Sequence, residues 1–64
     1  RYVFYVEGAD SLTVDLSAMA GVGAAVVVDA LAPYAEIDLG ALTPAVHTLR
    51  FAAVSDWAVS VVVE

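Results

Sequence analysis

The sequence predicts an all-β protein, a small antiparallel β-sandwich of about six short strands that forms a single domain over residues 1–64. Apolar and polar residues alternate with a period of two along most of the chain, which is typical of strands with one buried face. Short turns marked by glycine, proline or aspartate separate these runs at the spacing found in sandwiches and small barrels.

Two alternating runs, "RYVFYVE" (1–7) and "SLTVDLS" (11–17), predict the first two strands. Between them, "GAD" (8–10) is typical of a turn, because glycine permits positive φ and aspartate can hydrogen-bond the backbone that follows it. Side chains expected to point inward are Tyr2, Phe4, Val6, Leu12, Val14 and Leu16.

The next run, "AAVVVDA" (24–30), is apolar on both faces, which indicates a strand in the centre of a sheet or beneath a covering layer. A helix over residues 24–32 is the alternative, since alanine is the best helix former. Three consecutive valines, with Gly23 before them and Pro33 after them, favour the strand.

The last three strands are predicted at "YAEIDLG" (34–40), "VHTLRFAA" (46–53) and "WAVSVVV" (57–63), with a turn at "VSDW" (54–57). In the first of these, Ala35, Ile37 and Leu39 face inward and Tyr34, Glu36 and Asp38 face water. Trp57 starts an inward series of valines, so we expect it in the core rather than on a sugar-stacking surface.

The composition indicates apolar surface that something else covers. The chain is 62% hydrophobic with a mean hydropathy of +0.90, and it has no cysteine. Its longest uncharged apolar run, residues 18–28, is shorter than the roughly 20 residues of a membrane-spanning helix. Because residue 1 and the final "SVVVE" both lie in strand patterns, we expect a module from a longer chain, prone to self-association when isolated.

The net charge of −6, with two arginines and no lysine, argues against binding to nucleic acid or to an anionic membrane surface.

No catalytic arrangement is evident, because His47 is the only histidine. Glu36 and Asp38 lie about 7 Å apart on one strand face, but any solvated face needs such groups. Asp10, Asp15 and Asp56 lack a calcium-loop spacing, so we expect no metal and no cofactor.

The best candidate for ligand contact is Tyr34, at the mouth of a proline-marked turn with Glu36 and Asp38 on the same strand face. An exposed aromatic ring can stack on the apolar face of a sugar. We therefore predict a binding site at Tyr34, Glu36 and Asp38 in preference to any catalytic site.

The order of "YVFYVEGADSLTVDLSAMAG", "AAVVVDA" and "DWAVSVV" resembles the C-terminal β-sandwich, described as collagen-binding, that follows apiosidase-like (β/α)₈ domains of bacterial glycoside hydrolases. The matching positions are Tyr2, residues 13–17, Asp56 and Trp57. The chain departs from that family at "VDALAPYAEIDLG" (28–40), where the family often has an aromatic residue and an "NPRTG"-like turn. A second, partial resemblance links residues 33–51 to discoidin-type carbohydrate-binding modules.

These resemblances imply a non-catalytic accessory domain of an extracellular or cell-surface bacterial glycoside hydrolase, which packs against the adjacent catalytic domain and stabilises it. They bring no catalytic residues to this chain, because catalysis in such proteins belongs to the barrel. Two alternatives remain open: a carbohydrate-binding module that contacts polysaccharide through Tyr34, and a structural or adhesive repeat of a surface protein.

Overall fold

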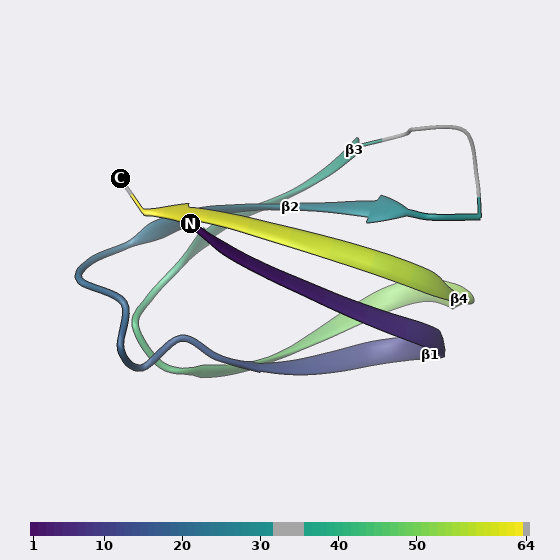
Figure 1. Ribbon diagram of the computed structural model, residues 1–64, viewed down its shortest axis with the longest axis horizontal. Helices are drawn as coiled ribbons and strands as arrows, with labels where there is room; N and C mark the ends of the chain where they lie inside the picture. Colours follow the sequence, from purple (N-terminus) through teal and green to yellow (C-terminus); the bar gives the residue numbers. More distant parts are fainter. Residues whose placement is uncertain (32–35, 64) are drawn as a thin grey trace.

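A computed structural model describes residues 1–31 and 36–63, and these residues form strands, turns and loops without a helix. The strands are β1 (Tyr2–Asp15), β2 (Gly23–Asp29), β3 (Glu36–Leu42) and β4 (Val46–Val63). They form one antiparallel sheet in the order β1-β4-β2-β3, shown in Figure 1. The all-β prediction is confirmed.

The prediction of six short strands is wrong, because β1 and β4 each combine two of the predicted runs. Both long strands bend at the same end of the molecule and return, as Figure 1 shows. The first half of β1 pairs with the second half of β4, while residues 11–15 of β1 pair with residues 46–50 of β4. The structure is thus a single sheet bent over itself, and two separate sheets of a sandwich are not shown.

The bend in β1 occurs at the predicted turn of residues 8–10, where the register with β4 shifts. Gly8 has a φ of 61°, a conformation that glycine adopts without steric cost. Its backbone N–H donates to Asp56 Oδ1 at 2.9 Å. The expected glycine conformation is therefore present, but it produces a bulge at which one continuous strand bends back, rather than a turn between two separate strands.

The bend in β4 is held by Trp57, whose side chain is 3% exposed. Its indole N–H donates to the carbonyl oxygens of Ala9 at 2.9 Å and Ala53 at 3.2 Å, so it joins both long strands at their bends. The ring stacks on Phe51 with centroids 4.7 Å apart. The predicted core position of Trp57 is confirmed.

The hydrophobic core lies between the two halves of the bent sheet. The period-two pattern of the sequence prediction is clearest in β2 and in the second half of β4, where alternate residues are buried. Strand β3 has no buried residue, and Ile37, which the alternation predicts to face inward, is 45% exposed. The buried apolar side chains are Val14, Leu16, Met19, Ala25, Val27, Leu49, Trp57, Val59 and Val61. Tyr2, Phe4 and Val6 pack against this cluster, as predicted.

Strand β2 is an inner strand between β4 and β3, which confirms the central strand and rules out the helix over residues 24–32. Ser55, which is buried, donates its hydroxyl to Asp29 Oδ1 at 2.5 Å. This bond fastens the end of β2 to the bend of β4. The predicted turn at residues 54–57 is therefore part of the bend in the continuous strand β4, and it does not separate two strands.

The loop after β1 begins with Asp15, whose Oδ1 accepts hydrogen bonds from the backbone N–H of Ser17 at 3.0 Å and from its hydroxyl at 2.6 Å. These bonds hold the pKa of the Asp15 carboxyl below its usual value. The side chain thus has a local role in starting the loop.

Candidate functional site

The most distinctive surface is the face of the four-stranded region that points away from the core, which we call the outer face. Cross-strand pairing arranges its residues in rows. One row consists of Val3, Ser60, Val26 and Asp38. The next row consists of Tyr5, Ala58, Val28 and Glu36. Ala24 and Val62 pair in the row beyond.

The outer face is apolar even though it is exposed. Val3 is 66% exposed, Tyr5 is 55% exposed and Val62 is 50% exposed. A soluble strand normally carries polar groups on its wet face, whereas here valines recur on both faces of β2 and β4. Contiguous exposed apolar surface of this kind marks interaction sites.

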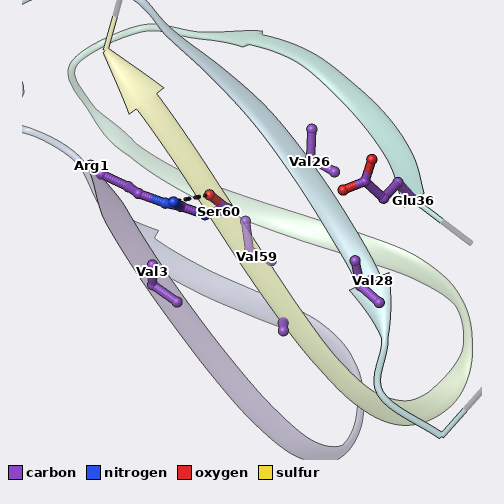
Figure 2. Close-up of a pocket in the computed structure, with 8 residues that line it drawn as sticks. Arg1, Val3, Val26, Val28, Glu36, Val59 and Ser60 are labelled. Atoms are coloured by element: carbon purple, nitrogen blue, oxygen red, sulfur yellow. Dashed lines mark hydrogen bonds between the residues drawn. The ribbon is translucent and has the colours of Figure 1, made fainter. Parts of the chain in front are cut away.

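A shallow groove of 320 Å³ crosses this face, as Figure 2 shows. It forms because β4 contributes small side chains, Ala58 and Ser60, between the larger valines of β1 and β2. The residues that line the groove are Arg1, Val3, Val26, Val28, Glu36, Ala58, Val59 and Ser60.

Polar groups stand at the ends of the groove. Arg1 donates from Nε to the Ser60 hydroxyl at 3.2 Å, on the β1 side. Glu36 lies at the opposite side, on β3 (Figure 2). The groove therefore has a cation at one end and a carboxylate at the other.

The bend end of the outer face is acidic as well. Partial desolvation raises the pKa of the Tyr5 phenol, and the carboxylates of Asp56 and Glu7 raise it further by favouring the neutral form. Negative charge is thus concentrated near Tyr5 and along β3.

The predicted site residues are only partly brought together. Glu36 and Asp38 are both exposed and pair with Val28 and Val26, so both lie on the outer face as predicted. Tyr34 lies outside the described residues, and its predicted role stays a prediction.

Asp38 is exposed, and its carboxylate also forms a hydrogen bond within its own strand. Its Oδ1 accepts a hydrogen bond from the Gly40 N–H at 2.7 Å. Gly40 has a φ of 77° and lies at the register shift between β2 and β3. The carboxylate of Asp38 therefore stabilises a β-bulge in this edge strand.

Sequence reasoning missed the contribution of Arg1, Val3 and Ser60 to the groove. A signal was present, because "AAVVVDA" is apolar on the face opposite the core. That signal could not identify the neighbours of Val26 and Val28, since those depend on strand order and register.

Groups that could take part in catalysis have local structural partners. His47 Nε2 lies 2.8 Å from the Thr43 carbonyl oxygen, and Asp56 accepts from Gly8. Within residues 1–31 and 36–63, no group of three histidine, cysteine, aspartate or glutamate side chains is placed to hold a metal ion. The same residues contain no helix suited to crossing a membrane.

Comparison with protein-family models, curated proteins and solved structures finds no match to this chain. A function therefore has to be inferred from its own residues and their arrangement.

Proposed function

We propose that this chain is a non-catalytic accessory domain whose outer face packs against a neighbouring catalytic domain of the same polypeptide. The observation that carries the proposal is the exposed apolar outer face with its groove. The sequence resemblance supplies the context, an extracellular or cell-surface glycoside hydrolase of bacterial type. The chain contributes stability and position to such a protein, and the partner supplies the chemistry.

The size of the outer face supports a neighbour in the same polypeptide. Four strands at the usual spacing, over the described rows, span about 15–20 Å in each direction, or roughly 225–400 Å². Doubled for two partners, this is about 450–800 Å², which overlaps the lower end of the range for interfaces between domains of one chain, about 600–1,500 Å² in total. A neighbouring layer on this face would also complete the layered arrangement that the resemblance implies.

The test is a pair of double variants that add lysine to exposed valines. Val3→Lys with Val62→Lys alters the outer face, while Val46→Lys with Val54→Lys makes the same chemical change at positions of similar exposure elsewhere. In the isolated chain, both pairs should change stability by no more than about 1 kcal/mol. When the chain is joined to its neighbouring domain, the double variant on the outer face should lower the unfolding temperature of the whole protein. The control double variant should leave that temperature unchanged.

Equal unfolding temperatures for the two joined variants would contradict the proposal. A large loss of stability in the isolated chain, confined to the outer-face pair, would show instead that these valines belong to the core of the domain.

Carbohydrate binding is the second candidate, favoured by one observation: Glu36, Arg1 and Ser60 bring polar groups to the apolar groove. Sugars bind such mixed surfaces through hydrogen bonds and apolar contacts. Titration of the ¹⁵N-labelled chain with soluble oligosaccharides tests it. Amide shifts clustered at Glu36, Asp38 and Ser60 would support binding, and an unchanged spectrum would argue against it.

A further inference from the structure

We infer that the outer face recognises an apolar ridge bordered by basic side chains, an inference that rests on the proposed function and specifies the chemistry of the partner surface. The apolar rows supply the contact area, and the carboxylates around them supply charge that is complementary to basic side chains of the partner.

The charge around the outer face is unevenly distributed. Glu36 and Asp38 lie along its β3 side, and Glu7 and Asp56 lie near Tyr5 at the bend. Arg1 lies at the opposite corner, where its Nε donates a hydrogen bond to the Ser60 hydroxyl. Complementary potentials steer association and suppress wrong partners, so the surface that fits here carries lysine or arginine opposite the two acidic sides.

The shape of the groove defines the apolar part of the partner. The floor is formed by Ala58 and Ser60, with Val3 on one side and Val26 and Val28 on the other. Its volume of 320 Å³ is on the order of ten times the volume that one water molecule occupies. It therefore accepts protruding apolar side chains, and a flat surface would leave it unfilled.

A second copy of this chain fits poorly, because each copy has a net charge of −6 and the same acidic sides on its outer face. The roughly 225–400 Å² available per copy is also at most about half of the 800 Å² that each partner contributes to a stable complex. A tethered partner needs less area, since a short linker supplies an effective concentration in the millimolar range.

The experiment uses two model peptides as probes. One forms an amphipathic helix with a leucine stripe bordered by lysines, and the other has glutamate at every lysine position. The ¹⁵N-labelled chain is titrated with each at low ionic strength. The lysine peptide should shift amides of Val26, Ala58 and Ser60, and raising the salt to 0.5 M should weaken its binding at least threefold.

Two double variants with the same change in net charge separate local recognition from overall attraction. Glu36→Gln with Asp38→Asn removes two acidic groups from the outer face, and should weaken lysine-peptide binding about three- to tenfold. Val46→Lys with Val54→Lys also changes the net charge by +2, and should alter binding less than twofold. A dispersed spectrum of each variant confirms that it is folded.

Several results would overturn the inference: equal binding of the two peptides, equal loss of affinity in the two double variants, or shifts confined to the free edges of β1 and β3. The proposed function is tested separately. If the valine-to-lysine pair on the outer face destabilises the joined protein while the lysine peptide fails to bind, the face is a domain interface whose partner is not basic.

Discussion

At the scale of single residues, Trp57 has the largest structural role, because one side chain holds the bends of both long strands. Its ring is buried against Phe51, and its N–H is shared by the carbonyls of Ala9 and Ala53. Burial of the ring and satisfaction of these carbonyls are separate contributions to stability. Two substitutions can therefore distinguish them.

We expect Trp57→Ala to cost about 3–5 kcal/mol, since it removes a buried aromatic ring and leaves a cavity. Trp57→Phe keeps most of the ring but removes the N–H, and should cost about 1–3 kcal/mol. Urea denaturation followed by circular dichroism measures both. Because a domain of this length has a total stability of roughly 3–10 kcal/mol, the alanine variant should lose about a third or more of it; a near-neutral result would place Trp57 outside the core.

At the scale of elements, the beginning of β2 depends on the absence of a side chain at Gly23. A Cβ there would lie 2.6 Å from Val61 Cγ1 and 3.0 Å from Met19 Sδ, both in the core. Gly21, in the preceding loop, has no such neighbour within 4 Å and does not have a positive φ. The two glycines form a matched pair for one substitution.

Gly23→Ala should lower the free energy of unfolding by about 1–3 kcal/mol through overpacking. Gly21→Ala should leave it unchanged or raise it by up to about 1 kcal/mol, because alanine restricts the unfolded chain. Thermal unfolding of both variants checks the contrast. Similar midpoints for the two would show that Val61 and Met19 move aside without cost, and that the contact does not define where β2 begins.

Strand faces were predictable from sequence, but strand continuity was not. Alternation placed Val14 and Leu16 inward, and Glu36 and Asp38 outward, because successive side chains of a strand must point to opposite sides. The same local pattern cannot decide whether residues 8–10 separate two strands or form the bend of one continuous strand. That choice depends on pairing with β4, and in particular on the bond from Gly8 to Asp56, which lies 48 residues along the chain.

The candidate site was predictable to the same limited extent. The exposure of Glu36 follows from the local pattern, whereas the groove requires Val3, Ser60 and Val26 to share one row. Each comes from a different strand, and their alignment is set by register. Similarly, the apolar outer side of "AAVVVDA" signals a covering partner but does not identify it.

At the scale of the whole molecule, the position of the apolar segments determines how copies of the chain can meet. The valine-rich runs of β2 and the second half of β4 lie in inner strands, so their backbone edges are already paired. One free edge belongs to β3, where Glu36, Asp38 and a bulge discourage pairing with another sheet. Self-association should therefore proceed mainly through the outer face.

Two opposing forces set the extent of that association: the apolar outer face favours it, and a net charge of −6 per copy opposes it. The Debye length falls from about 30 Å at 0.01 M salt to about 8 Å at 0.15 M. The isolated chain should consequently sediment as a monomer at low salt and show growing, weak association as salt increases. Analytical ultracentrifugation at several salt concentrations measures this self-association. The double variant Val3→Lys plus Val62→Lys should suppress the increase with salt, and the control Val46→Lys plus Val54→Lys should preserve it. A tight dimer at low salt would contradict the prediction, because it would show that the acidic sides do not keep two copies apart and that a second copy is a suitable partner for the outer face.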